Sequence, residues 1–129
     1  MKWFYVLILA LCSHSLLAKT EIHLVKDDSV NASSTHITES PVVPNGKIVK
    51  LKKLGCIDPA IGDGLDSIIV LQWGTGGSWT TIRACSRNSE FIINRDFIGD
   101  GINKFRVLRM NESITPKVIV FWLEALIKD

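Results

Sequence analysis

Residues 117–127 read KVIVFWLEALI, and this stretch decides the fold class of the chain. Its first half consists of β-branched and aromatic side chains, which lose less conformational freedom in a pleated sheet than in a helix. An apolar series then occupies every second position, namely Ile119, Phe121, Leu123, Ala125 and Ile127. This period of two predicts a strand that turns the apolar series towards a core.

Five further segments have the same composition, and Gly, Asp, Asn and Pro residues separate them at short intervals. These segments are 47–54, 67–73, 78–85, 90–97 and 104–110. No segment has a convincing helical period. The pattern therefore predicts an all-β fold, a small antiparallel sandwich or jelly-roll-like barrel of about six to seven strands.

The same alternation predicts which side chains are buried. Those expected to face the core are Phe91, Ile93, Phe97, Phe105 and Val107. Segment 67–73 is apolar on both faces, as strands covered on both sides are. We therefore expect it to be a central, covered strand.

A short motif occurs twice, as IGDGLD at 61–66 and as IGDGIN at 98–103. Each copy precedes a strand, a polar loop and another strand, which predicts two pseudo-repeated hairpin units; chance similarity of Asp-Gly turns is the alternative. Calcium is a second hypothesis, since it needs six or more oxygen ligands and the motifs contribute several. These are Asp63, Asp66, Asp96, Asp100 and Asn103. Neither motif has EF-hand spacing, so we expect turn chemistry and neither a metal site nor a cofactor.

The first eighteen residues differ in kind from the rest. Lys2 precedes the apolar run 3–11, and the small residue Ala18 precedes the polar stretch 19–21. This order is typical of a cleaved secretory signal peptide, and the run is shorter than the roughly 18 apolar residues of a membrane anchor. We expect residues 1–18 to be a signal peptide. The mature chain is then secreted or extracytoplasmic and has no membrane span.

Residues 19–45 are rich in Ser and Thr, contain Pro41 and Pro44, and show no sustained apolar period. Such a composition is typical of a flexible arm or linker. A short strand over 20–26 is the one element that its apolar residues allow. The sequence therefore predicts an arm at 19–45 followed by a single β-sandwich domain at 46–129.

Removal of residues 1–18 leaves two cysteines, Cys56 and Cys85. In an oxidising compartment such a pair is typical of one disulfide, with two buried free thiols as the alternative. The pair lacks CxxC spacing and a neighbouring histidine, which disfavours a metal site. A buried Cys85 also brings Arg83 to the inward face of its strand unless a bulge intervenes, and both arrangements stay open.

The charges of the mature chain nearly balance. Without Lys2, 14 basic residues stand against 13 acidic ones, which argues against nucleic acid as a partner. The densest basic cluster is Lys47, Lys50, Lys52 and Lys53, which alternates with apolar residues. We interpret this cluster as an edge strand that lysines protect from pairing with another chain; a patch for an anionic surface is the alternative.

The loop Gly74-Thr75-Gly76-Gly77 lies between two tryptophans, Trp73 and Trp79. Glycines leave a hairpin tip bare, and two nearby indoles could form a flat platform for a sugar ring or for an apolar patch of a partner. Trp122 is expected to point outward from its strand. The candidate ligand-binding residues are therefore Trp73, Trp79 and Trp122, with burial of Trp73 and Trp79 in the core as the alternative.

No arrangement of residues indicates catalysis. His23 and His36 have no visible orienting partner, and no acid pair has the setting of a glycosidase. Asn31 and Asn111 fit the glycosylation sequon. We predict a secreted, non-catalytic binding or structural module for a protein or carbohydrate. The alternative is a secreted inhibitor or effector that blocks an enzyme through an exposed loop.

Overall fold

The structure of the chain is a computed structural model that describes residues 20–57, 67–86 and 88–128. These residues form ten strands and no helix, which confirms the predicted all-β class. The strands are β1 (Thr20–Lys26), β2 (Ser29–Val30), β3 (Ser34–Glu39), β4 (Ile48–Ile57), β5 (Ile68–Thr75), β6 (Ser78–Ser86), β7 (Ser89–Ile98), β8 (Lys104–Asn111), β9 (Lys117–Val118) and β10 (Val120–Lys128). The proposed signal peptide lies outside the described residues.

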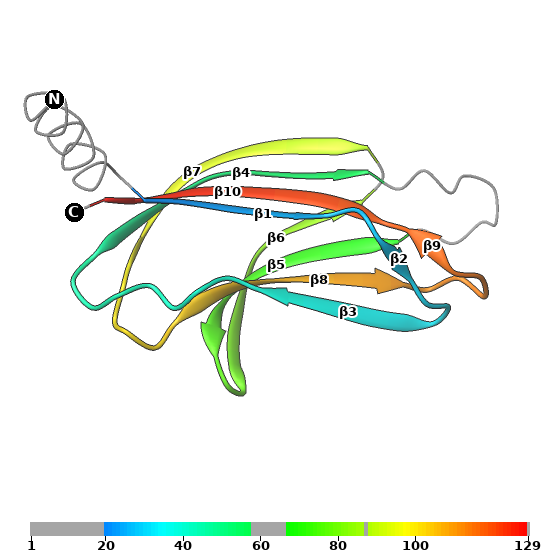
Figure 1. Cartoon of the computed structure of the whole chain (residues 1–129), viewed down its shortest axis with the longest axis horizontal. Helices are drawn as coiled ribbons and strands as arrows, with labels where there is room; N and C mark the ends of the chain where they lie inside the picture. Colours follow the sequence, from blue (N-terminus) through cyan, green and yellow to red (C-terminus); the bar gives the residue numbers. More distant parts are fainter. Residues whose placement is uncertain (1–19, 58–66, 87, 129) are drawn as a thin grey trace, which may run out of the picture.

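The strands form two four-stranded antiparallel sheets that face each other as the layers of a sandwich (Figure 1). One sheet has the order β1-β10-β4-β7, and the other has the order β3-β8-β5-β6. We call them the β10 sheet and the β5 sheet. A two-stranded ladder of β2 and β9 lies at one end. The sheets do not close into a barrel, so of the two predicted architectures the sandwich is the one observed.

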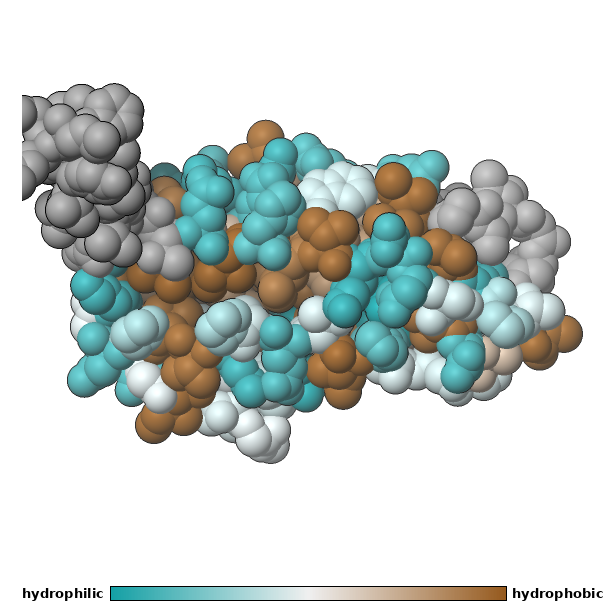
Figure 2. Space-filling view, in the orientation of Figure 1, coloured by the Kyte–Doolittle hydropathy of each residue, from teal (hydrophilic) through white to brown (hydrophobic). Residues whose placement is uncertain are grey.

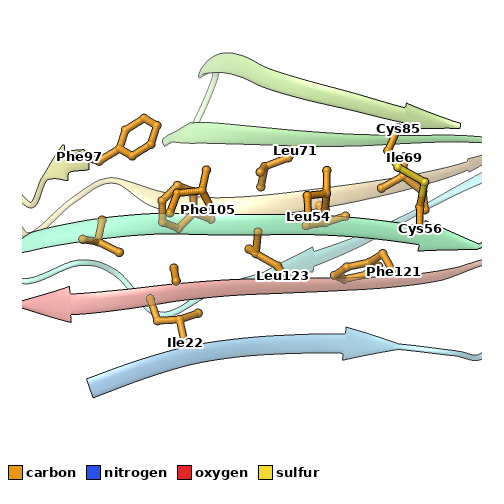
Figure 3. Packing of buried hydrophobic residues seen from close by; sticks show 14 of the residues in the cluster. Ile22, Leu54, Cys56, Ile69, Leu71, Cys85, Phe97, Phe105, Phe121 and Leu123 are labelled. Atoms are coloured by element: carbon orange, nitrogen blue, oxygen red, sulfur yellow. A yellow bond between two sulfur atoms is a disulfide. The ribbon is translucent and has the colours of Figure 1, made fainter. Parts of the chain in front are cut away.

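The core lies between the two sheets and is built from alternate residues of their strands (Figure 3). The inward series of β10 is buried from Ile119 to Ala125, and Phe105 and Val107 of β8 are buried opposite it. Phe97 is buried as well, while Phe91 and Ile93 are half-buried against the same cluster. Burial of one such side chain contributes about 1.5–3 kcal/mol relative to exposure, so this alternation is the main source of stability.

A disulfide between Cys56 of β4 and Cys85 of β6 joins the two layers, with 6.3 Å between the Cα atoms (Figure 3). The predicted disulfide is therefore present. On the chain-entropy model, closing a loop of this length stabilises the fold by about 3–4 kcal/mol. Covalent attachment also fixes which face of β6 meets the β10 sheet.

Arg83 shares the inward parity of Cys85, because Leu71 lies opposite Arg83 and Ile69 opposite Cys85 in the register of β5 and β6. The one irregularity in this ladder lies beyond Arg83, so no bulge separates the two residues. Arg83 is nevertheless exposed, and its guanidinium carbon lies 3.9 Å from the ring centroid of Phe91. The charged group thus stays in water at the open margin of the sandwich while it covers an aromatic ring.

The described part of the expected arm belongs to the sandwich, so that prediction is wrong for residues 20–45. The strand expected at 20–26 is present as β1 and pairs with β10, and β3 pairs with β8. Ile22, Val30 and Val43 add buried apolar side chains. The composition was misleading because β1 and β3 are edge strands, and an edge strand pairs through its backbone even when most of its side chains are polar.

The lysine-rich strand β4 is not an edge strand, which corrects the interpretation of its lysines. It lies between β10 and β7 in the β10 sheet. A central strand with one solvent face shows the same alternation of lysine and apolar residues as a protected edge strand does. The lysines therefore do not guard an edge.

The second Gly-Asp motif forms a turn, while the first lies outside the described residues. Asp100 Oδ1 accepts hydrogen bonds from the backbone nitrogens of Ile102 at 2.9 Å and Asn103 at 2.8 Å, which is the expected turn chemistry. These bonds lower the pKa of Asp100 below its ordinary value of 3.8. β5 and β6 form the hairpin expected of the first unit, but β8 and β10 lie in different sheets. The two units therefore do not repeat one architecture.

Candidate binding surfaces

The three tryptophans lie at separate places and do not form one platform. Trp73 packs inside the sandwich, with its ring centroid 4.7 Å from that of Phe105 and 5.1 Å from that of Phe97. Trp122 lies on the outer face of the β10 sheet, against the backbone of Gly55, and a Cβ atom at Gly55 would overlap its indole. Trp73 thus takes the core position that was the alternative for it.

Trp79 lies at the β5–β6 hairpin on the outer face of the β5 sheet. Its Nε1 donates to the carbonyl of Gly76 at 2.6 Å, and Gly76 has a φ of 56°, which suits glycine. The guanidinium carbon of Arg106 lies 4.0 Å from the centre of the indole. Arg106 Nε also donates to Gln72 Oε1 at 2.7 Å, so ring and guanidinium are held in place.

The outer face of the β5 sheet is apolar over four strands. One row across the sheet runs through Ile37, Leu108, Val70 and Ala84, which are successive partners in the strand register. The next row contains Met110 opposite Ile68. We call these six residues the apolar face. Ile37 is 49% exposed, Ala84 is exposed and the other four are half-buried.

None of the strands that the structure describes covers the apolar face (Figure 1). The solvent side of an antiparallel sheet normally carries polar residues, so this contiguous apolar area is a candidate interaction surface. Exposure of single apolar residues is ordinary: Figure 2 shows hydrophobic patches interspersed with hydrophilic side chains on the side seen there. The apolar face differs from such single residues because its side chains are contiguous across neighbouring strands.

The sequence contains a signal for this surface, but the same signal also predicts a strand that is covered on both sides. Segment 67–73 is apolar on both faces, and a strand covered on both sides was expected. β5 is indeed central in its sheet, and Ile69 and Leu71 are buried in the core. Ile68 and Val70, however, form part of the uncovered outer face.

The margin of the apolar face carries charge. Lys104 Nζ lies 2.6 Å from Glu39 Oε2, so these two charges are paired. Arg106 has no ion pair among the residues that the structure describes, and its contacts there are Gln72 and the ring of Trp79. The surface thus combines an apolar centre with a tryptophan and an unpaired arginine, the residue types enriched at binding hot spots.

A buried arginine connects the N-terminal strands to the core at the β2–β9 end. Arg109 has 0% exposure, and its Nη1 donates to the carbonyls of Asp28 at 3.0 Å and Ile119 at 2.9 Å. Its Nη2 lies 2.7 Å from Asp28 Oδ1 and 2.7 Å from His36 Nδ1, which must accept because guanidinium has only donors. The hydrogen bond from Arg109 to the Asp28 carboxylate lowers the pKa of Asp28 below its ordinary value of 3.8. We assign this cluster a structural role.

Asn111 is a second buried organiser of the same end. It is 2% exposed, and its Nδ2 lies within 3.2 Å of the carbonyls of Val30, Asn31 and Thr115. Ser113 donates to its Oδ1 from both the backbone and the hydroxyl. Glycan attachment at Asn111 would displace these contacts, whereas Asn31 is exposed. Of the two sequons, Asn31 has the accessible side chain.

Within residues 20–57, 67–86 and 88–128, no group of three or more His, Cys, Asp or Glu side chains is placed to hold a metal ion. No helix long and apolar enough to cross a membrane occurs there either.

Comparisons with known proteins find weak structural likenesses. No family model matches the sequence, and no curated protein matches it. PirA has a TM-score of 0.41 at 16% identity, over 77% of this chain and 92% of that one. The NLP core of Drosophila, a pentamer-forming, histone-binding protein, has a TM-score of 0.42 at 11% identity, over 83% and 98%. The Yersinia pseudotuberculosis-derived mitogen has a TM-score of 0.37 at 13% identity, over 80% and 88%. These likenesses indicate no function for this chain.

Proposed function

We propose that this chain is an exported, non-catalytic binding module that docks a protein partner through the apolar face of its β5 sheet. The observation that carries the proposal is the unbroken row from Ile37 to Ala84 on the solvent side of a sheet. Arg106 at the margin supplies a cation without an ion pair among the described residues. The partner surface is therefore flat and apolar, with a carboxylate opposite Arg106.

A protein fits this surface better than a carbohydrate does. Sugar recognition needs polar groups that are free to bond hydroxyls, and the six side chains of the apolar face have no N–H or O–H group. The indole nitrogen of Trp79 is engaged by Gly76, and one side of its ring is covered by Arg106. Trp122 lies against Gly55, so one face of each of these two indoles is already covered.

Export is part of the proposal and has two supports. The disulfide between Cys56 and Cys85 is consistent with an oxidising location. The pattern of residues 1–18 is that of a secretory signal peptide. Mass spectrometry of the natural protein tests this: a mature chain that begins at Lys19 supports export, and one that retains residues 1–18 contradicts it.

A loop-inserting inhibitor is the second candidate function, and one observation favours it. The 112–116 loop is held from inside by Asn111 and Ser113, while Ile114 at its surface is 83% exposed. A rigid loop that presents an apolar side chain loses little entropy when it enters a partner's pocket. Under this alternative, Ile114→Ala weakens partner binding more than any change on the apolar face.

The partner can be identified by photo-crosslinking and the surface tested by matched variants. A photoreactive phenylalanine at position 37, the exposed β3 end of the apolar face, is used to trap the partner in extracellular fluid of the source organism. Affinities of the purified pair are then measured for Val70→Lys and Arg106→Ala. The matched control is Ile92→Lys, because Ile92 is 76% exposed on the opposite sheet.

We expect Val70→Lys to weaken binding by roughly 30-fold or more, as loss of a hot-spot residue does. Arg106→Ala is expected to weaken binding by roughly tenfold through loss of a charged contact. Ile92→Lys leaves the affinity unchanged. Equal effects of Val70→Lys and Ile92→Lys would reject the apolar face as the docking site, as would occupation of that face by a second copy of the chain.

A further inference from the structure

The lysines of β4 gather on one face because the strand contains a bulge. In a regular strand Lys52 and Lys53 would point to opposite sides. The ladders of β4 with both β10 and β7 are irregular at Lys52, which has no assigned partner between Leu51 and Lys53. Leu51 and Leu54 therefore both stay in the core, while Lys52 and Lys53 both lie outside. Bulges commonly re-aim side chains near functional sites.

The bulge forms one side of a hollow on the outer face of the β10 sheet. The hollow has a volume of about 430 Å³, and its cations are Lys50, Lys52 and Lys53 of β4 and Lys128 of β10. Ile92 and Leu126 add apolar surface to its lining. Asn94 of β7, opposite the bulge, has a φ of 48°, so the backbone on that side is irregular as well.

Among the described residues, acids pair with one of the four ammonium groups, that of Lys53. Lys53 Nζ lies 3.7 Å from Glu124 Oε2 and 4.0 Å from Glu90 Oε1. Glu90 is held in addition by the indole nitrogen of Trp122 at 2.8 Å. Within the described part of the chain, Lys50, Lys52 and Lys128 form no ion pair. Three cations thus line a hollow in which Glu124 is the one acid among the described lining residues.

We propose that this hollow binds the sulfate, phosphate or carboxylate group of an anionic carbohydrate. Three unpaired ammonium groups supply the donors that an oxyanion needs, and lysine binds such groups as a point charge without demanding one geometry. Ile92 and Leu126 provide apolar contact for the C–H face of a sugar ring. This second site lies on the sheet opposite the apolar face, so it is independent of the proposed protein docking.

A membrane surface and a nucleic acid fit the hollow less well. A flat bilayer would meet the whole outer face of the sheet, where Glu90, Asp96 and Glu124 offset most of the positive charge. Single-stranded nucleic acid is held by bases stacked on aromatic rings, and none of the described residues that line the hollow is aromatic. A compact oxyanion inside the hollow, in contrast, lies close to the unpaired lysines.

The test uses a sulfated octasaccharide of defined composition and its desulfated counterpart, titrated against the mature protein by calorimetry. Three variants each remove one cation from the hollow: Lys50→Gln, Lys52→Gln and Lys128→Gln. Lys26→Gln is the matched control, because Lys26 is an exposed lysine of β1 outside the hollow. Circular dichroism verifies that each variant keeps the β-sheet spectrum.

We expect the sulfated sugar to bind and the desulfated sugar not to bind, with affinity that falls as salt rises. Each hollow variant should weaken binding by roughly fivefold, and Lys26→Gln should leave it unchanged. No binding of the sulfated sugar, or equal weakening by Lys26→Gln, would overturn the proposal. Lysine-dependent binding to phosphatidylserine vesicles without binding of the sugar would overturn it in favour of a lipid surface. None of these outcomes bears on Val70 and the apolar face.

Discussion

The buried arginine offers the sharpest test of how the N-terminal strands are held in the sandwich. Arg109→Met keeps an unbranched side chain of similar length and removes every polar contact of the guanidinium. The carbonyl of Ile119 then loses its hydrogen-bond donor. Because Ile119 is fully buried, water cannot replace that donor. The carbonyl and carboxylate of Asp28 also lose their donor, but the Asp28 side chain is 57% exposed and can be hydrated instead.

The expected loss in the free energy of unfolding follows from these two environments. A buried acceptor without a partner costs about 1–3 kcal/mol. Loss of the bonds to Asp28 and His36 adds to this cost, whereas relief of the desolvation of a fully buried charge opposes it. We therefore expect Arg109→Met to lower the free energy of unfolding by about 2–3 kcal/mol. That is a large share of the ~5–15 kcal/mol typical of a small domain.

Urea unfolding followed by tryptophan fluorescence measures the effect. Arg106→Met is the control, because Arg106 lies on the same strand but faces outward; we expect the loss of its contacts with Gln72 and Trp79 to lower stability by no more than about 1 kcal/mol. Hydrogen exchange adds a local readout, since faster exchange in β1 to β3 is expected for Arg109→Met alone. An Arg109→Met protein as stable as wild type would refute the structural role of the cluster.

Three further predictions concern stability. Replacement of both Cys56 and Cys85 by Ala should lower the free energy of unfolding by about 3–4 kcal/mol, and wild type measured under reducing conditions should give the same value if the disulfide is the cause. Gly55→Ala should lower the free energy of unfolding by about 1–3 kcal/mol, because the added Cβ overlaps the indole of Trp122. Trp122→Leu in the same chain should recover part of this loss. An unchanged melting temperature for Gly55→Ala would contradict this packing. The hydrogen bond that lowers the pKa of Asp28 stabilises the fold fully above the ordinary pKa of 3.8, and this stabilisation is lost as pH falls through the lower pKa of the folded state. Asp28→Asn should therefore make stability depend less on pH in the acid range. An unchanged acid dependence would exclude this linkage.

The strands from β4 onward could be predicted because their alternation is set locally. The observed ranges of β4 to β8 differ from the prediction by a few residues at their ends, whereas the single strand predicted at 117–127 is divided into β9 and β10, which lie in different sheets. Its inward series is buried from Ile119 to Ala125, and Ile127 is half-buried. The disulfide could be predicted as well, because the expected mature chain contains one even pair of cysteines. These features depend on residue type and spacing alone.

The remaining features depend on partners that composition does not reveal. β3 is polar at nearly every position and becomes a strand because β8 offers its free edge. The bulge at Lys52 breaks the period of two, so parity alone would have pointed one of the two adjacent lysines inward. The two-sided apolar character of β5 was visible, but whether a second layer covers its outer face is decided by the whole topology. Both candidate sites therefore emerge only in three dimensions.

Docking of a partner on the apolar face of the β5 sheet can be mapped residue by residue. The measurement is methyl NMR of the chain, titrated with the partner recovered by crosslinking. We predict shifts for the methyl groups of Ile37, Val70 and Leu108, and none for Ile92 and Ile98 on the opposite sheet. Shifts of Ile92 and Ile98 with Ile37, Val70 and Leu108 unchanged would contradict the account.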